Sequence, residues 1–135
     1  MTFIVSYQKF INAEKSVEIN LPTDDATKRV GDELATVDGT TYVALPDATQ
    51  LPAQPEEITV MDVTLTPELK AAISAASPLV RLINDEVKDS IAAKYSLTDE
   101  IRLLRTQPSA EFTLYNQYVE ACRAEGRAKK AVLGL

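Results

Sequence analysis

Hydrophobic and polar residues alternate along the first part of the chain with the period of two that is typical of β-strands. Residues 2–10 are rich in β-branched and aromatic residues, and residues 16–21 place Val, Ile and Leu at every second position. Pro22 ends the second run, because proline has no amide hydrogen to donate to a strand ladder. The pattern therefore predicts β structure over both runs.

The dipeptide Asp38-Gly39 lies between two β-prone runs within residues 33–45. A two-residue turn of the primed type needs positive φ angles, which Asp and Gly adopt more readily than most residues. This dipeptide is therefore the strongest hairpin signal in the chain. We expect Val37 and Thr40 to flank the turn.

Three prolines, Pro46, Pro52 and Pro55, interrupt the next segment. Residues 46–57 are therefore predicted to form neither a regular helix nor a central strand, and to serve as an extended linker. A short apolar run over residues 58–65 follows. The sequence leaves open whether this run pairs with the hairpin or lies alone as an arm.

From Thr66 onward the hydrophobic pattern becomes helical. At Thr66 and Ser77 an N-cap residue stands directly before a proline, which is a typical helix start. Thr98, which precedes two acidic residues, and Ser109 are two further predicted starts. The apolar positions are Val80, Ile83, Val87 and Ile91 in one helix, Ile101, Leu103 and Leu104 in the next, and Phe112, Tyr115, Val119, Cys122 and Gly126 in the last. The last set has the spacing of a short heptad seam.

These patterns predict an α+β protein in three parts. Residues 1–45 form a small antiparallel β lobe, and residues 46–65 form a proline-rich linker and extended arm. Residues 66–135 form a helical domain, folded as a helical hairpin or a small bundle. We expect the apolar stripes of the helices to exceed what one small lobe buries, which favours self-association or contact with a partner.

Charge is distributed unevenly along the 135 residues. Residues 1–65 carry four basic and 11 acidic side chains, whereas residues 66–135 carry ten basic and nine acidic ones. The net charge of −6 argues against nucleic acid as the main partner. The basic stretch from Arg123 to Lys130 is interpreted as cations that suit the C-terminal end of a helix.

Composition also weighs against an enzyme. The chain has no His, which removes the commonest general base and metal ligand, and only one Cys. We interpret Cys122 as a buried structural thiol, because it lies on the apolar stripe of the last helix. No glycine-rich phosphate loop or nucleophile motif occurs. We therefore expect no enzymatic activity, no cofactor and no metal site. The N-terminus lacks a signal-peptide pattern, and no apolar run is long enough to cross a membrane.

Five adjacent carboxylate pairs are the remaining catalytic candidates. They are Asp24-Asp25, Asp32-Glu33, Glu56-Glu57, Asp85-Glu86 and Asp99-Glu100. Neighbouring residues of a helix or strand point to different sides, so adjacency does not bring two carboxylates together. We interpret these residues as solvated acids or helix-start acids.

The aromatic and arginine residues between positions 95 and 118 are interpreted as packing, surface or interface residues. Tyr95, Tyr115 and Tyr118 are interpreted as core or interface residues rather than as a ligand site. Arg102 and Arg105 are expected to pair with acids such as Glu100 or Asp99 on a solvated face, although arginines beside aromatic residues also favour interfaces. The predicted partner interface consists of Leu103, Leu104, Phe112, Tyr115, Tyr118 and Val119.

Residues 77–135 resemble the C-terminal segments of small proteins encoded in the tail-gene clusters of tailed bacteriophages, near the fibre and baseplate genes. The matching parts are the Lys94-Tyr95-Ser96 turn, Asp99-Glu100-Ile101 followed by Leu103-Leu104-Arg105, and the Tyr115–Gly126 helix that leads to basic residues and Leu135. The order of strands, proline-rich linker and helices is also similar to that of tail-fibre assembly proteins. The resemblance implies a non-enzymatic tail protein, either a structural component of the fibre or baseplate or a fibre-assembly chaperone.

Under this hypothesis the partners are other tail proteins or further copies of the chain, without nucleic acid or membrane. The protein would be made in the host cytoplasm, and a structural component would stay in the virion tail. One alternative is a module that binds host glycans, with Tyr7, Phe10 and Tyr42 as contacts. Another is a hydrolase with unrecognised carboxylates, for which Asp24, Asp25, Asp32 and Glu33 are the candidates.

Overall fold

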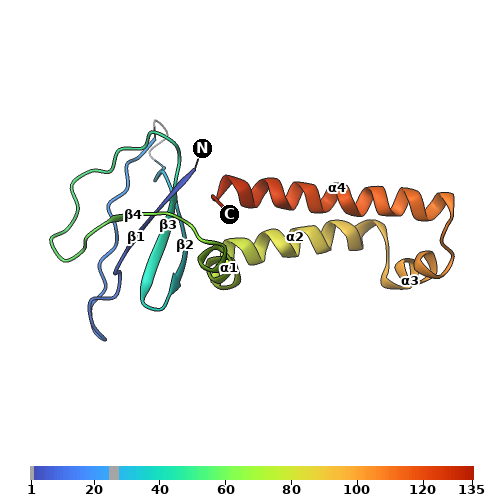
Figure 1. Cartoon of the computed structure of the whole chain (residues 1–135), viewed down its shortest axis with the longest axis horizontal. Coiled ribbons are helices and arrows are strands. Elements are labelled where there is room, and N and C mark those ends of the chain that lie inside the picture. Colours follow the sequence, from blue (N-terminus) through green and yellow to red (C-terminus); the bar gives the residue numbers. More distant parts are fainter. Residues whose placement is uncertain (1, 25–27) are drawn as a thin grey trace. The chain divides into compact units, whose positions relative to one another are not determined.

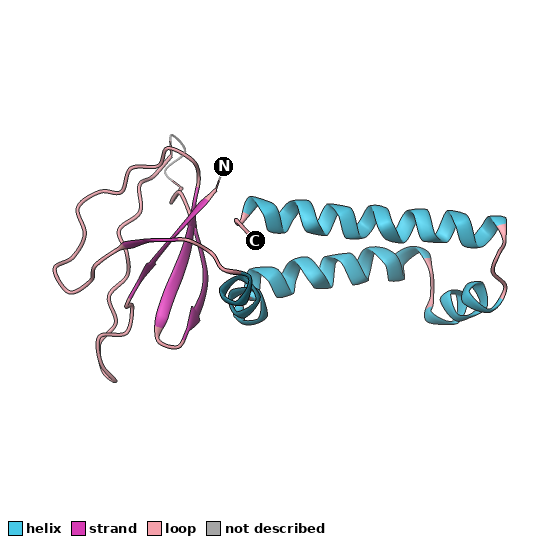
Figure 2. Cartoon of the chain, viewed as in Figure 1, coloured by secondary structure: helices cyan, strands magenta, loops and turns pink. Residues whose placement is uncertain are grey.

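The computed structural model describes residues 2–24 and 28–135. A four-stranded antiparallel sheet near the N-terminus is followed by four helices (Figures 1 and 2). This arrangement confirms the predicted α+β class. The strands lie in the order β2-β3-β1-β4.

The predicted hairpin is present between β2 (Asp32–Val37) and β3 (Thr40–Leu45). Asp38 has a φ of 50° and Gly39 a φ of 81°, so both turn residues are in the left-handed region that a primed turn requires. Val37 pairs with Thr40 across the turn, as expected. The register shifts between Glu33 and Ala35, which marks a β-bulge in β2.

The first strand, β1 (Phe3–Tyr7), lies between β3 and the short β4 (Met61–Val63) and pairs antiparallel with both. Part of the apolar run at residues 58–65 therefore joins the sheet. This answers the question that the sequence left open, because an arm that lies alone would leave its backbone groups without ladder partners.

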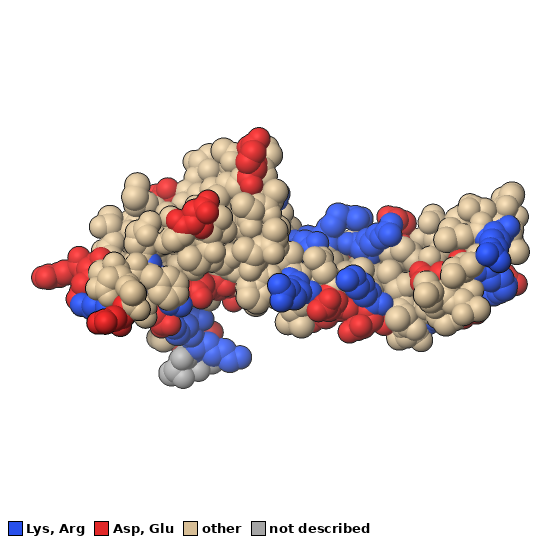
Figure 3. All heavy atoms as spheres, turned by 90° about the horizontal axis from the view of Figure 1, so that it is seen from below, with Lys and Arg blue, Asp and Glu red and all other residues tan. Residues whose placement is uncertain are grey.

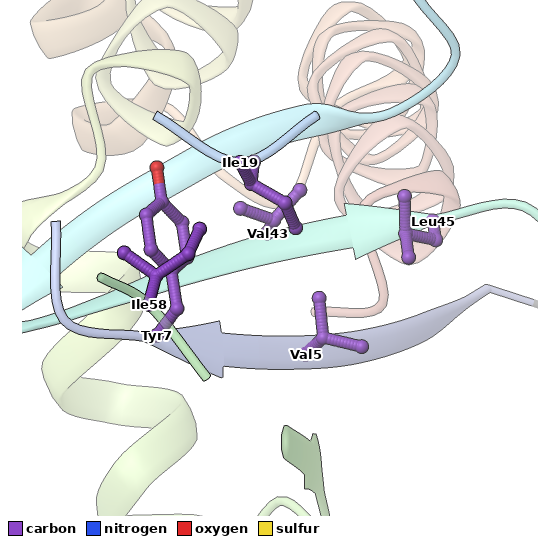
Figure 4. Close-up of a cluster of buried hydrophobic side chains, with 6 residues drawn as sticks. All are labelled: Val5, Tyr7, Ile19, Val43, Leu45 and Ile58. Carbon is purple, nitrogen blue, oxygen red and sulfur yellow. The ribbon is translucent and has the colours of Figure 1, made fainter. Parts of the chain in front are cut away.

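One face of the sheet is covered by chain that forms no regular element. Val5, Tyr7, Val43 and Leu45 from the sheet pack with Ile19 and Ile58 in a buried cluster (Figure 4). Val17, Leu21, Leu51, Val60 and Phe3 pack around this cluster. The non-strand segments that cover the sheet are held together by hydrogen bonds between Asn20 and Gln54.

The expected β structure over residues 16–21 is therefore only partly formed. Ser16 makes a single isolated bridge with Phe10, and residues 17–21 belong to no strand. Alternation of apolar residues correctly marked which side chains face the core. It does not show whether the backbone finds a ladder partner, and here the backbone of Asn20 bonds to a Gln54 side chain instead.

The opposite face of the sheet meets α1 (Pro67–Ala76) and the end of the chain. α1 contacts β2, and its Ile73 is fully buried. The hydroxyl of Thr2 donates a hydrogen bond of 2.7 Å to the carbonyl oxygen of Val132. Gly134, at a φ of 81°, lies against Ile4, so close that a side chain at position 134 would crowd it. Residues 132–135 are thus part of the sheet unit.

The second compact unit contains α3 (Leu97–Arg105) together with most of α2 (Pro78–Lys94) and α4 (Ala110–Val132). α2 and α4 run antiparallel (Figure 1). Gly126 permits their close approach, because a Cβ there would lie 2.7 Å from Val87. The predicted N-caps at Thr66, Ser77 and Ser109 are confirmed, since each side-chain oxygen accepts a hydrogen bond from the amide three residues later.

The two compact units comprise residues 1–80 with 132–135, and residues 81–131. They group α1 and the last four residues with the sheet. The division that the sequence suggested, at residues 45 and 65, differs from this grouping and stays a prediction.

Candidate functional site

The helix α3 has one buried and one exposed apolar side. Leu103 is only 2% exposed and packs with Tyr115 and Val119 of α4. In contrast, Leu97, Ile101 and Leu104 are 73%, 44% and 51% exposed. Their spacing of four and three residues places them on one side of a helix that turns about 100° per residue. We call these three residues the α3 stripe.

The N-terminus of α3 is held by a capping box. The Ser96 hydroxyl accepts a hydrogen bond of 3.1 Å from the amide of Asp99, and the Asp99 carboxylate accepts one of 3.3 Å from the amide of Ser96. The predicted start at Thr98 is therefore wrong by two positions. Ser96 and Thr98 are both good N-cap residues, but only Ser96 has an acidic residue three positions later to complete the box.

A salt bridge joins α3 to α4. Arg102 donates to the Glu111 carboxylate at 3.1 Å. The expected pairing of Arg102 with Asp99 or Glu100 is not the one observed, because Asp99 caps the helix and Glu100 accepts a hydrogen bond from Tyr115. This salt bridge between two helices, together with the packing of Leu103, fixes the direction in which the α3 stripe faces.

The aromatic residues of this unit form a cluster. Tyr95 lies edge-on to Tyr115, with 5.0 Å between ring centroids, and 5.8 Å from Tyr118. Phe112 is 6.1 Å from Tyr115, and the Lys94 ammonium lies 4.4 Å from the ring centroid of Tyr118. These contacts agree with the interpretation of the tyrosines as packing residues.

Each of two tyrosine hydroxyls donates a hydrogen bond. Tyr118 donates to the carbonyl oxygen of Ser90 at 2.8 Å, and Tyr115 donates to the carboxylate of Glu100 at 2.7 Å. The bond to the negatively charged Glu100, together with burial, raises the pKa of Tyr115 above its ordinary value of 10.0. The Tyr115 hydroxyl thus keeps its proton to a higher pH than a free tyrosine does, and its bond to Glu100 links α4 to α3.

The six residues of the predicted partner interface fall into three groups. Leu103, Tyr115 and Val119 are buried inside the unit, and Phe112 and Tyr118 are half-buried. Only Leu104 presents about half of its side chain to solvent. The prediction that these six residues bind a partner stays a prediction, and intramolecular packing accounts for the apolar character of most of them.

Sequence reasoning did not single out the most exposed apolar residues of this unit. It treated Ile101, Leu103 and Leu104 as one surface and left Leu97 and Leu114 aside, although Leu114 is 63% exposed. The signal was the spacing: at about 100° per residue, Leu103 points well away from the side that Leu97, Ile101 and Leu104 share.

Three of the catalytic candidates form ion pairs with lysines. Glu33 pairs with Lys9 at 3.1 Å, Glu57 with Lys15 at 3.4 Å and Glu86 with Lys129 at 2.8 Å. Hydrogen bonds from its own backbone amide and from Lys15 lower the pKa of Glu57, whereas a general acid at neutral pH needs a raised one. Asp25, one of the hydrolase candidates, lies outside the described residues.

Two further placements bear on the alternatives. Cys122 is buried, as expected for a structural thiol. Of the aromatic residues proposed for glycan contact, Tyr7 is buried in the sheet core and Tyr42 is half-buried, whereas Phe10 is exposed.

Among residues 2–24 and 28–135, no three His, Cys, Asp or Glu side chains group as metal ligands, and no helix has the length and apolar character to span a bilayer.

Comparison with known proteins shows no match to the chain, whether among protein-family models, curated proteins or solved structures. The fold and the surface described above define an α+β protein with a fixed, exposed apolar helix face.

Proposed function

We propose that this chain acts through protein–protein contacts in the tail of a tailed bacteriophage, as a fibre or baseplate component or as a fibre-assembly chaperone. The class of virus comes from the sequence resemblance over residues 77–135. The observation that carries the contact function is the α3 stripe, in which Leu97, Ile101 and Leu104 are exposed on one helix side. A helix that presents apolar residues at this spacing is a recurring mode of partner recognition.

The orientation of the stripe is set before any partner arrives. Leu103 anchors the opposite side of α3, Ser96 and Asp99 cap its start, and Arg102 bridges to Glu111. A helix held at three points loses little conformational freedom on binding, which reduces the entropic cost of association.

The size of the stripe limits how tightly it binds by itself. Full burial of an exposed Leu or Ile side chain contributes about 1.5–3 kcal/mol, and these three are partly covered already. Their combined gain is roughly 3–6 kcal/mol, against an association cost of about 4–15 kcal/mol. A partner must therefore also contact surface beside the stripe, and Leu114 on α4 is a further exposed apolar residue of the same unit.

The test compares two triple variants by co-expression with the tail proteins encoded by neighbouring genes. L97Q/I101Q/L104Q removes the stripe, and F10Q/I11Q/M61Q removes three exposed apolar residues of the sheet unit as the matched control. We expect the wild type and the control to capture a tail protein, and the stripe variant to capture about tenfold less. Equal capture by all three proteins, or no capture by the wild type, contradicts the proposal.

Two measurements separate the forms that the proposed function takes. Mass spectrometry of purified virions detects the chain if it is a structural component and not if it is a chaperone that leaves the assembled tail. Size-exclusion chromatography with light scattering gives the native mass and tests for a homo-oligomer. A monomer that captures no tail protein contradicts both forms.

A further inference from the structure

α2 and α4 pack against each other, and the two hollows beside their contact differ in charge and in volume. On one side Lys129 pairs with Glu86 at 2.8 Å and with Glu125 at 3.7 Å. The hollow on that side measures only ≈ 20 Å³. The hollow on the other side of this contact measures ≈ 360 Å³, and no Asp or Glu lines it. One side is thus closed by ion pairs, and the other is open and basic.

Four cations surround the larger hollow, which we call the basic groove. Lys88 comes from α2, and Arg123, Arg127 and Lys130 come from α4. Val87 and Gly126 also line it, and these two residues mark the close approach of the helices. Figure 3 shows basic side chains gathered in groups along the helices of this unit.

Neighbouring acids neutralise this charge only in part. Arg123 pairs with Glu120 at 3.1 Å, whereas Lys88, Arg127 and Lys130 form no ion pair within the described residues. The negative end of the α4 dipole favours Lys130, in the last turn of that helix. It does not account for Lys88, which lies inside α2. Like charges around one hollow raise its potential and attract an anion.

We propose that the basic groove binds a short acidic segment of a partner protein, with carboxylates at the four cations and an apolar side chain against Val87 and Gly126. The charge of the groove is complementary to such a segment, and its mixed lining suits a ligand that is both anionic and apolar. This site is distinct from the α3 stripe, and it does not depend on the assignment to a bacteriophage.

The dimensions favour a peptide over a nucleic acid. The cations on α4 run from position 123 to position 130, which is about 10 Å along a helix axis. A nucleic-acid strand continues past such a groove, whereas a short peptide ends within it. Nucleic-acid sites extend a basic surface over many phosphates, and this groove has only four cations.

The test measures binding of a fluorescein-labelled peptide of five glutamates around a central leucine, by fluorescence anisotropy at low ionic strength. K88Q/K130Q removes one lysine from each wall of the groove. K28Q/K70Q changes two exposed lysines of the sheet unit and gives the same net charge. We expect K88Q/K130Q to weaken binding about five- to tenfold, K28Q/K70Q to leave it within about twofold, and added salt to weaken it in the wild type.

Four results overturn the proposal. They are no binding of the peptide by the wild type, an equal loss in both double variants, tighter binding of a single-stranded DNA oligonucleotide that is equally sensitive to K88Q/K130Q, and a dimer of the wild type that K88Q/K130Q dissociates. The third result assigns the groove to nucleic acid, and the fourth assigns it to a second copy of the chain. Circular dichroism of both double variants verifies that the helices are retained.

Discussion

The sheet unit and the helical unit cover their apolar residues to different degrees. In the sheet unit Leu34, Leu45 and Ile73 are fully buried, and both faces of the sheet are covered by other parts of the unit. In the helical unit Leu103, Tyr115 and Val119 form a small buried cluster, whereas Leu97 and Leu104, on the same helix as Leu103, lie exposed.

The difference follows from geometry. A sheet has two faces, and irregular chain can adapt its path to cover either of them. A hairpin of helices buries only the stripe that faces the neighbouring helix, so a helix with apolar residues on two sides leaves one side open. The sheet unit therefore covers both faces of its sheet, although Phe10, Ile11 and Met61 stay exposed on it. The helical unit presents three exposed apolar residues on one side of a single helix, which a partner can cover.

The adjacent leucines Leu103 and Leu104 test this contrast most strongly. Leu103→Ala removes a side chain that is 2% exposed, and we expect it to lower the free energy of unfolding by about 2–5 kcal/mol through the cavity it leaves. Leu104→Ala should change it by less than about 1 kcal/mol, because this side chain is half exposed. Urea denaturation followed by circular dichroism measures both. Equal losses would remove the distinction between the two sides of α3.

Gly126 tests how closely α2 and α4 approach. Gly126→Ala places a methyl group 2.7 Å from Val87, so we expect a loss of about 1–3 kcal/mol in the free energy of unfolding. In a Val87→Ala background the contact is relieved, and the same change should be stabilising by up to about 1 kcal/mol, since Ala favours helix more than Gly. The double-mutant cycle gives the coupling. Additive effects would mean that the helices do not touch at this position.

Gly39 provides the corresponding test in the sheet unit. Its φ of 81° is in the region that costs a residue with a Cβ about 1–2 kcal/mol, so Gly39→Ala should lower the free energy of unfolding by about that amount. The matched control is Gly39→Asn, which tolerates this conformation better and should cost less. If Ala and Asn have the same effect, the primed turn is not the reason for glycine at this position.

The smallest expected effect concerns the hydroxyl of Tyr115. Tyr115→Phe removes the hydrogen bond to Glu100 and should cost about 1 kcal/mol at neutral pH. Because the folded state raises the pKa of Tyr115, it binds the proton more tightly than the unfolded state does. The stabilisation is therefore complete below about pH 10 and is lost as the pH rises through the folded pKa. The difference between wild type and variant should shrink above pH 10 in denaturation curves, and a constant difference would contradict the assigned bond.

Sequence patterns predicted the fold class, the hairpin turn and three of the helix starts, because these depend on local rules such as φ preference and N-capping. They failed where a distant partner decides. The run at residues 16–21 has strand alternation, but its Asn20 bonds to the Gln54 side chain. Two good N-caps, Ser96 and Thr98, stand close together, and the capping box decides between them.

The candidate site was predicted only in outline. The sequence indicated the region of α3 and α4, and the spacing distinguishes Leu103 from its neighbours. It does not show which side of α3 finds Tyr115 and Val119, because that depends on how α3 packs on α4. The basic groove was equally hidden, since Lys88 and Lys130 are far apart in sequence and line one hollow only in the folded hairpin.

The most direct test of the contact function is photo-crosslinking from inside the proposed surface. A benzoylphenylalanine replaces Leu104 in one protein and Met61, a somewhat more exposed residue of the sheet unit, in another. Each is expressed with the tail proteins of neighbouring genes and irradiated, and the crosslinked products are identified by mass spectrometry. We predict a crosslink to a tail protein from position 104 and none from position 61. Absence of a crosslink at position 104, or equal crosslinking from both positions, would contradict the account.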